Sequence, residues 1–166
     1  MSSLDQLDLF LGEEEINPAY CVDISDIDID FGDTSYIAEQ KSKTCKRLQD
    51  LPKGKYLIYK GEPKRGHINE VLPYIKNTHK GRIVSTRDSR NTYPSVDVGN
   101  RSYCMHIIVC MAFIPNVLPK DRTHVDHIDG DKNNYAVENL RWVTPSENQL
   151  NKDFKKRNPI ELELDL

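Results

Sequence analysis

The chain has 166 residues, of which 37% are hydrophobic and 30% charged, and its formal net charge is −3. This length predicts one compact domain with tails, and the composition allows only a modest core. No run of roughly 18 apolar residues is present and the N-terminus lacks the features of a secretory signal, so neither a membrane span nor secretion is expected. The four cysteines form no CxxC pair, which favours free thiols in a reducing cytoplasm over a zinc frame or a disulfide framework.

Charge is distributed unevenly along the chain. Residues 1–40 contain 11 acidic and no basic residues, and residues 159–166 add three acidic ones. All 23 Lys and Arg residues therefore lie in residues 41–158, together with 12 acidic residues. A basic body suits a polyanion binder, because neutralising phosphates releases counterions. We expect the body to bind nucleic acid, although a solvated surface of mixed charge would give the same count.

The N-terminal half predicts a tail, one helix and short strands. Residues 11–40 alternate acidic residues with isoleucine (DISDIDIDFGD), and one face of a strand with this pattern would be all aspartate. We therefore predict that residues 1–40 are largely disordered. A short helix is predicted over residues 36–50, ended by Leu51-Pro52. Strands are predicted next, over residues 55–60, 81–85 and 93–98.

The next segment predicts a hairpin followed by a buried helix. Gly99-Asn100 is a hairpin turn signal that leads into the sequence RSYC. Residues 105–114 (MHIIVCMAFI) carry apolar side chains on all sides, which predicts a helix inside the core, and Pro115 stops it.

Residues 124–134 read HVDHIDGDKNN, an unusual concentration of side chains that bind metals. A calcium loop of EF-hand type is excluded, because Gly130 at the sixth position would place Val125 at the first. Structural zinc is not expected because no cysteine lies nearby. A solvated turn explains DGDKNN but not the histidines.

The residues that follow predict a strand and then a helix. Residues 138–144 (ENLRWVT) have strand character, and residues 145–152 (PSENQLNK) begin a helix. Thr144 can cap this helix, with Pro145 at its first position and Glu147 completing a capping box. The predicted order is a strand, a long turn, a strand and a helix, which is a ββα unit.

VDHIDGDKNN, ENLRW and VTPSENQLNK together resemble the HNH nuclease motif, in the form found in homing and free-standing endonucleases of phages and group I introns. The upstream sequence YPSVDVGNRSYCMHIIVCMAFIPN resembles their hairpin, helix and AFIPN segment, so the resemblance covers roughly residues 93–152. The four functional positions of the family correspond to Asp126, His127, Asn139 and Asn148. Two departures exist: His106-Ile107 replaces the frequent His-Arg, and KGRIVS only weakly matches the N-terminal DNA-binding module.

The resemblance implies a chemistry that the residue types support. His127 would take the proton of the attacking water. Asp126 and Asn148 would supply hard oxygen ligands to one divalent ion, Mg²⁺ or Mn²⁺. Asn139 would orient His127 and hold the turn. Asp126 and His127 are adjacent, however, and a regular strand points neighbours to opposite faces, so the strand must bend, bulge or end there.

The expected fold class is α+β: a small mixed domain with the HNH ββα-metal motif at its C-terminal end and acidic flexible tails. We predict a degenerate DNA-binding region at 41–92, a nuclease domain at 93–158 and an acidic tail at 159–166. Asp129 is interpreted as a turn former, Trp142 as core, and His106 as a core or substrate-facing residue. Phosphate contacts are predicted for Arg82, Arg87, Lys132, Arg141, Lys152, Lys155, Lys156 and Arg157.

The expected function is a metal-dependent DNA endonuclease of homing type, phage-encoded and acting on double-stranded DNA in the cytoplasm of a bacterial host. The alternative is a DNA-binding or regulatory protein on an HNH scaffold that does not cut. The residues QLDLF at positions 6–10 resemble the peptide by which bacterial proteins dock on the DNA sliding clamp. This resemblance implies anchoring through Gln6, Leu7, Leu9 and Phe10, with a terminal helix turn packed on the body as the alternative.

Overall fold

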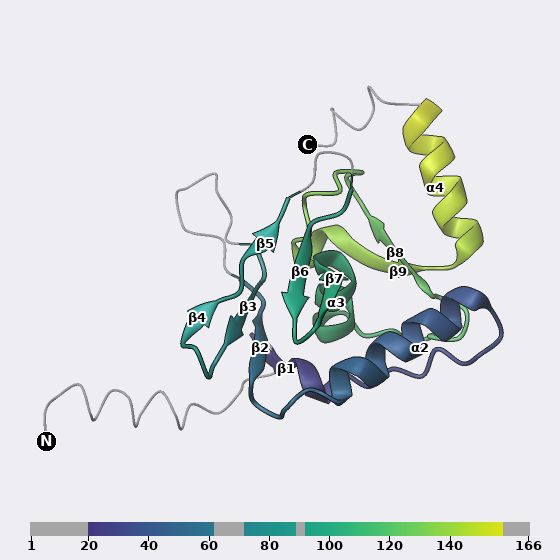
Figure 1. Cartoon of the computed structure of the whole chain (residues 1–166). Coiled ribbons are helices and arrows are strands. Elements are labelled where there is room, and N and C mark those ends of the chain that lie inside the picture. Colours follow the sequence, from purple (N-terminus) through teal and green to yellow (C-terminus); the bar gives the residue numbers. More distant parts are fainter. Residues whose placement is uncertain (1–19, 62–71, 89–91, 158–166) are drawn as a thin grey trace, which may run out of the picture.

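The computed structural model describes residues 20–61, 72–88 and 92–157, which form a mixed α+β fold (Figure 1). The N-terminal elements are β1 (Cys21–Asp23), the 3₁₀ turn η1 (Ile24–Asp26), α2 (Tyr36–Gln49), β2 (Tyr56–Tyr59), β3 (Tyr74–Asn77), β4 (Arg82–Ile83) and β5 (Thr86–Arg87). The C-terminal elements are β6 (Ser95–Val98), β7 (Arg101–Cys104), α3 (Met105–Phe113), β8 (His124–His127), η2 (Val137–Asn139), β9 (Leu140–Val143) and α4 (Pro145–Arg157).

The strands form small antiparallel sheets. The first sheet has the order β1-β2-β3-β4, the second has the order β5-β6-β7, and the third is the β8-β9 pair. Figure 1 shows α3 in the middle of the molecule, with the strands of the first two sheets to its left and α2 below it. The pair β8-β9 and helix α4 occupy the opposite side.

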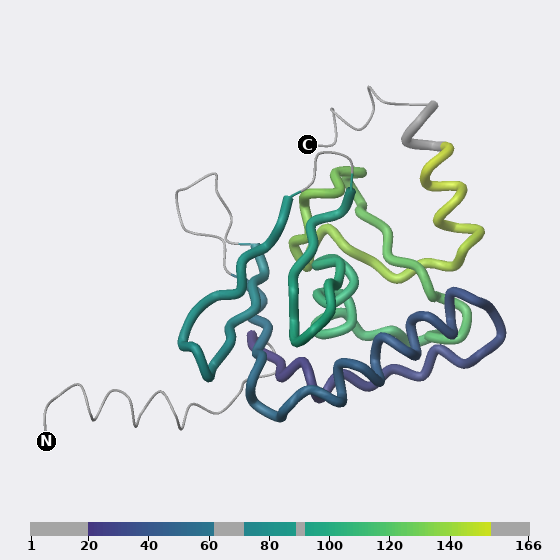
Figure 2. The backbone as a smooth tube through the Cα atoms, viewed as in Figure 1, coloured from purple at the N-terminus to yellow at the C-terminus, as the bar shows by residue number. Residues whose placement is uncertain are grey.

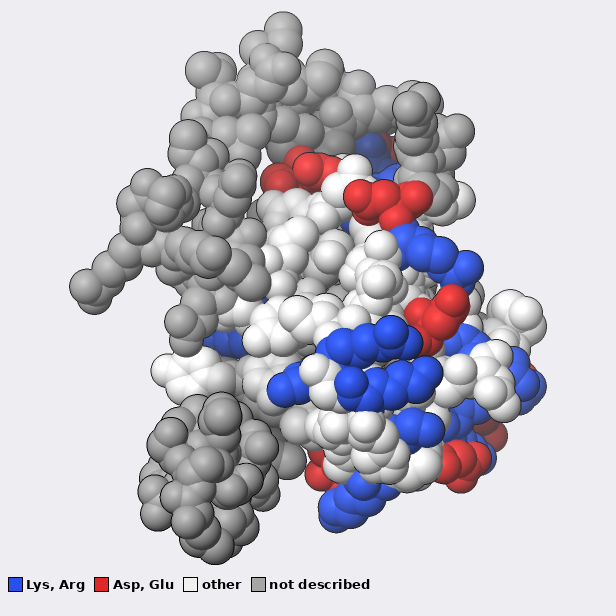
Figure 3. All heavy atoms as spheres, turned by 60° about the vertical axis from the view of Figure 1, so that its left-hand side comes forward, with Lys and Arg blue, Asp and Glu red and all other residues white. Residues whose placement is uncertain are grey.

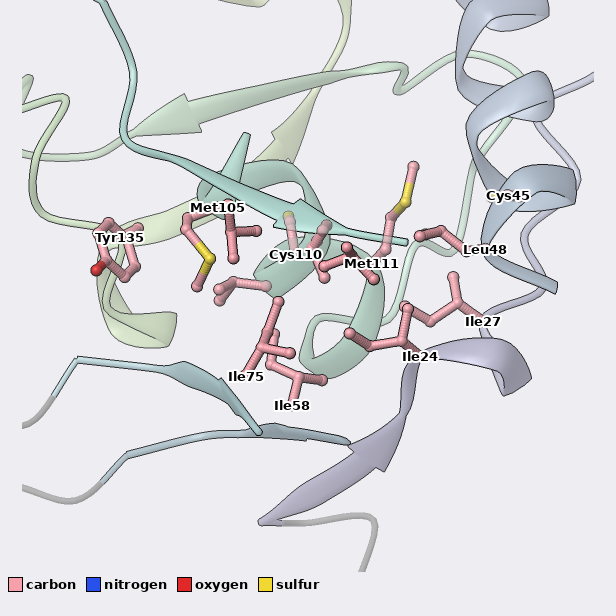
Figure 4. Close-up of a cluster of buried hydrophobic side chains, with 14 of the residues drawn as sticks. Ile24, Ile27, Cys45, Leu48, Ile58, Ile75, Met105, Cys110, Met111 and Tyr135 are labelled. Carbon is pink, nitrogen blue, oxygen red and sulfur yellow. The ribbon is translucent and has the colours of Figure 1, made fainter. Parts of the chain in front are cut away.

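Helix α3 supplies the centre of the hydrophobic core. Met105, Ile108 and Val109 have no exposed surface, which confirms the prediction of a buried helix. Side chains from η1, α2, β2 and β3 converge on this helix (Figure 4), and the same cluster extends to Trp142 on β9. The core therefore holds the ββα unit and the N-terminal sheets together.

The acidic segment 20–40 is ordered, contrary to the predicted disorder. Ile24 and Phe31 have no exposed surface and Ile27 is 3% exposed. These three side chains are spaced three and four residues apart. The 3₁₀ turn η1 ends the extended conformation after Asp23, so the segment does not have the alternating faces of a strand. Phe31 packs against Trp142 with ring centroids 5.5 Å apart. The prediction failed because the isoleucines were assigned to an acidic tail, whereas they belong to the core.

The aspartates of this segment serve as local hydrogen-bond acceptors. Asp23 is 4% exposed and accepts bonds from the main-chain N–H of Ser25 (3.0 Å), the hydroxyl of Ser25 (2.8 Å) and the N–H of Gly54 (2.7 Å). Asp30 accepts the N–H of Gly32 at 2.9 Å. Such bonds allow a run of acidic residues to turn at the surface of a core.

The segment around Gly32 runs beside the loop that follows α3, as the tube in Figure 2 shows. A Cβ atom at Gly32 would lie 3.4 Å from Cγ of Lys120, far away in the sequence. The N-terminal segment therefore supports the chain just before it enters β8.

Several predicted elements are confirmed. Helix α2 occupies nearly the predicted range, and Ser35 caps it through a bond to the N–H of Ala38 at 3.1 Å. The hairpin turns at Gly99, whose φ is 62° and where an added Cβ would lie 3.0 Å from Leu51. Strands β1, β3 and β5 were not predicted. None of the helices within the described ranges is long and apolar enough to cross a membrane.

Candidate active site

The ββα unit is built largely by local interactions. Strands β8 and β9 pair in register from His124 opposite Val143 to His127 opposite Leu140. The predicted capping box forms at the start of α4: the N–H of Glu147 donates to the Thr144 hydroxyl at 3.1 Å, and the N–H of Thr144 donates to the Glu147 carboxylate at 3.0 Å. These bonds fix the direction in which α4 leaves β9.

The long turn after His127 is held by Asp129 and Asn139. The Asn139 amide donates to Asp129 Oδ1 and to the carbonyl of Asn134, both at 2.8 Å, and accepts the N–H of Asp129 at 3.0 Å. Burial raises the pKa of Asp129, but bonds from Asn134, the main chain of Asp131 and Asn139, together with the charge of His127, outweigh it and lower that pKa. Asp129 is thus a turn former, as predicted.

The structure places the Asn139 amide on the turn that follows His127. Its main-chain oxygen accepts the N–H of Ile128 at 2.8 Å, immediately after His127. Asn139 therefore positions His127 through the backbone of the turn.

The carboxylate of Asp126 lies between β9 and α4. Its side chain is 5% exposed, and its Oδ2 atom accepts a hydrogen bond from Arg141 Nε at 3.0 Å and forms an ion pair with Nη2 at 2.9 Å. The Asn151 amide of α4 donates to the same oxygen at 3.2 Å. Asp126 and Arg141 are directly opposed in the β8-β9 ladder, so their pairing follows from the register.

The imidazole of His127 lies among aromatic rings from other elements. Its centroid is 5.0 Å from that of His106 on α3 and 5.6 Å from that of Tyr93, and the Tyr93 and His127 rings are stacked. Tyr93 also contacts His106 at 4.3 Å. The ammonium of Lys132 lies 5.2 Å from the centre of the Tyr93 ring.

His106 is buried, being 6% exposed, and its Nδ1 atom has no hydrogen-bond partner among the described residues. Burial, followed by the charges of His127 and Lys41, lowers its pKa to about 3. His106 is therefore a neutral ring that packs beside His127. Burial also raises the pKa of Tyr93, with Cys104 and Asp126 adding to the shift.

Strand β8 ends at His127. An end at this residue is one of the three arrangements, besides a bend or a bulge, that the adjacent Asp126 and His127 required. The ladder remains regular up to that residue, and the two side chains contact different neighbours. Asp126 contacts Arg141 and Asn151, whereas His127 contacts Tyr93 and His106. The two neighbouring side chains therefore have different surroundings at the end of β8.

Asn148, the second expected metal ligand, is half-buried on the first turn of α4, and its N–H bonds to the Thr144 carbonyl at 2.9 Å. Asn151, one turn later, is the residue whose amide contacts Asp126. Sequence reasoning missed Asn151, although its spacing of three residues from Asn148 places both on one helix face.

The described residues include no group of three His, Cys, Asp or Glu side chains that could hold a metal. One carboxylate and the amide oxygens of Asn148 or Asn151 nevertheless fit a hard divalent ion that keeps several water or phosphate ligands. The buried Asp126 already has a cationic partner in Arg141. This pairing is consistent with a site that attracts positive charge.

The predicted DNA-contacting residues fall into two regions. Lys132 and Arg141 border the site, and Lys152 is exposed on α4. Arg82 is exposed on β4, while Arg87 pairs with Asp97 and donates to Ser102 at 3.1 Å. Figure 3 turns the side of the molecule that carries β3 and β4 toward the viewer and shows Lys and Arg side chains gathered on that face. Lys155, Lys156 and Arg157 lie in the last turn of α4, and the clamp-type peptide 6–10 lies outside the described residues.

Comparison with known proteins identifies the segment that contains this site. Residues 103–150 match the sequence pattern of a family described as HNH endonuclease. This segment belongs to the HNH endonuclease family. It contains β8, the turn, β9 and the first turns of α4, so the family pattern includes all four expected functional positions.

Two curated proteins of Acanthamoeba polyphaga mimivirus resemble this chain, and both are named uncharacterized HNH endonucleases. One is 37% identical over 120 residues, which cover 69% of this chain and 27% of that protein. The other is 31% identical over 85 residues, which cover 44% of this chain and 25% of that protein. The chain thus spans about a quarter of the length of these relatives. No solved structure gives a significant match.

Proposed function

We propose that this chain is a metal-dependent HNH endonuclease that hydrolyses phosphodiester bonds in double-stranded DNA. The observation that carries the proposal is the pair Asp126 and His127 at the end of β8, inside a hydrogen-bonded ββα unit. An acid and an imidazole at one strand end bring together the two functions that hydrolysis needs. These are a base for the attacking water and a ligand for a cation.

In this mechanism His127 accepts the proton of the attacking water. An imidazole suits this task because it exchanges a proton near neutral pH. Tyr93 and His106 pack on its ring and limit its rotation, so that the base is held in position before DNA arrives. Asn139 fixes the chain that leaves His127 by ordering the following turn.

Asp126 and Asn148 would hold one Mg²⁺ or Mn²⁺ ion, with Asn151 on the same helix face. When bound, such an ion supplies positive charge to the phosphate oxygens and to the leaving oxygen. Lys132, whose ammonium lies over the Tyr93 ring, and the exposed Lys152 on α4 would contact neighbouring phosphates. Arg82 and the other basic side chains of the N-terminal sheets would contact the duplex farther along.

The direct test is cleavage of plasmid and genomic DNA by the full chain with Mg²⁺ or Mn²⁺. His127→Ala should reduce cleavage by orders of magnitude while leaving DNA binding intact. His79→Ala, which changes an exposed histidine in the β3–β4 turn, is the matched control and should cut like the wild type. Equal cleavage by wild type and His127→Ala would refute the assignment of the base.

The alternative is a DNA-binding or regulatory protein that does not cut. It would bind duplex DNA tightly yet leave every substrate intact with either metal. A nicking enzyme is a variant of the first proposal, because one active site cuts one strand unless two copies act together. Sequencing the ends of cut DNA distinguishes these outcomes, and 5′-phosphate with 3′-hydroxyl ends is expected.

We further propose that the enzyme is of homing type and phage-encoded, acts in a bacterial cytoplasm, and is tethered to the sliding clamp by residues 6–10. The support is the sequence QLDLF, in which Leu9 and Phe10 would enter an apolar pocket and Gln6 would bind its rim. A labelled peptide of residues 1–15 should bind a bacterial clamp with roughly micromolar affinity. If the full chain binds the clamp no better than its Leu9→Ala, Phe10→Ala variant, the tether is wrong.

A further inference from the structure

We propose that Arg141 is an exchangeable counter-ion of Asp126, which leaves the carboxylate when a divalent ion binds and then takes a DNA phosphate. The inference rests on the proposed function, because it assumes that Asp126 is a metal ligand. It assigns Arg141 a role beyond a simple phosphate contact. Arg141 would couple metal binding to DNA binding.

The first observation is the concentration of donors on one carboxylate oxygen. Oδ2 of Asp126 accepts a hydrogen bond from Arg141 Nε at 3.0 Å and one from the Asn151 amide at 3.2 Å, and it forms an ion pair with Arg141 Nη2 at 2.9 Å. The side chain of Asp126 is 5% exposed. A carboxylate this deeply buried needs a positive partner, since an uncompensated charge in such a place is strongly destabilising. Arg141 supplies that charge.

A divalent ion at Asp126 would remove this need. It would place two positive charges beside the carboxylate, and Arg141 at its present distance would then be repelled by the ion. Any ligand bond to Oδ2 would also displace the N–H donors that Oδ2 accepts now. Metal binding and the Asp126–Arg141 pair therefore compete for the same carboxylate.

Arg141 can leave without disturbing the core. Its side chain is 45% exposed, and its backbone remains fixed by the β8-β9 ladder. The side chain borders a surface cavity of about 340 Å³, lined also by Arg122, Glu147 and Leu150. The released guanidinium would stay at the edge of the active site, where it could donate two parallel bonds to a phosphate.

This exchange makes the binding of metal and DNA cooperative. A phosphate that holds Arg141 removes the competitor of the metal, so DNA should tighten metal binding. By linkage, metal must tighten DNA binding by the same factor. Without DNA, Arg141 weakens the metal site and keeps Asp126 neutralised.

The test measures Mn²⁺ binding by calorimetry to the full chain, without DNA. Arg141→Gln should bind Mn²⁺ at least about tenfold more tightly than wild type, because the competing charge is gone. Its metal-free form should melt at a lower temperature, and Mn²⁺ should raise that temperature more than in wild type. Arg101→Gln, which removes an exposed arginine from β7, is the matched control and should change neither value.

Arg141→Lys protects the test against misfolding. A lysine keeps the charge but cannot form the two parallel bonds, so its Mn²⁺ affinity should lie between those of wild type and Arg141→Gln. A second measurement uses a short duplex in the His127→Ala background, where DNA should tighten Mn²⁺ binding more with Arg141 than with Gln at this position.

The outcomes separate this inference from the proposed function. If Mn²⁺ binds and Asp126→Asn abolishes binding, while Arg141→Gln binds Mn²⁺ no more tightly than wild type, the inference alone is overturned. If neither wild type nor any variant binds Mn²⁺, or if Asp126→Asn binds it unchanged, the metal assignment falls and the inference falls with it.

Discussion

Acid should destabilise this protein through His106. The buried ring has a pKa of about 3, against 6.5 for an ordinary histidine. Between these pH values His106 binds a proton in the unfolded chain but not in the folded chain. The contribution of the neutral ring to the unfolding free energy is therefore complete above pH 6.5 and is lost as the pH falls toward 3. The rings of Tyr93 and His127 contact His106 and the charge of Lys41 acts on it, and none of these three groups offers a negative charge to a protonated His106.

The size of the effect follows from the shift. Each pH unit below the ordinary pKa costs about 1.4 kcal/mol, so lowering the pH from 7 to 5 should remove about 2 kcal/mol of unfolding free energy. This is a large part of a typical total of about 5–15 kcal/mol. The measurement is urea unfolding at a series of pH values, and the observable is the slope of unfolding free energy against pH.

The comparison is with His106→Phe, which keeps a ring in the stack but has no proton to exchange. Its slope between pH 7 and pH 5 should be shallower by about 1 kcal/mol per pH unit, whatever the substitution does to stability at neutral pH. Repeating both measurements with His124→Gln removes the contribution of His124, whose pKa is lowered by burial and by the charges of Lys41 and Lys152. Equal slopes for wild type and His106→Phe would refute the reasoning.

Two further substitutions test the core and the turn by urea unfolding. Phe31→Ala should cost about 3–5 kcal/mol, because a fully buried ring is lost from the acidic segment. Tyr36→Ala, at a residue that is 71% exposed, should cost under about 0.5 kcal/mol, and similar losses for the two would show that the segment does not belong to the core. Asn139→Ala should cost about 2–4 kcal/mol through its three hydrogen bonds and should slow cleavage strongly, whereas Asn133→Ala in the same turn should do neither. Unchanged cleavage by a folded Asn139→Ala would contradict its role in positioning His127.

The ββα unit could be predicted from the sequence because its signals are local. Thr144, Pro145 and Glu147 lie within four residues and form the capping box that the structure contains. Gly130 and the surrounding Asp and Asn residues specify a turn, since their side chains bond to nearby backbone groups. Adjacent Asp126 and His127 could therefore be assigned to the strand before this turn without knowledge of the rest of the molecule, whereas the sequence left open whether that strand bends, bulges or ends there.

The packing of the acidic segment depended on tertiary structure. Ile24 and Phe31 are core residues because α3 and Trp142 are present to cover them. Nothing within the segment itself supplies that cover, and the surrounding aspartates favoured an exposed tail on composition alone. The bonds that make Asp23 acceptable in a buried position come partly from Gly54, which lies 31 residues away.

The chemistry of the site also depends partly on the sequence and partly on the tertiary structure. The sequence determined which groups are available: a carboxylate, an imidazole and several amides at family spacing. Only the fold decided their partners, which are Arg141 and Asn151 for Asp126, and Tyr93 and His106 for His127. The physical reason is that a side chain's charge and hydrogen-bonding capacity belong to the residue, whereas its burial and its neighbours arise when distant segments pack together.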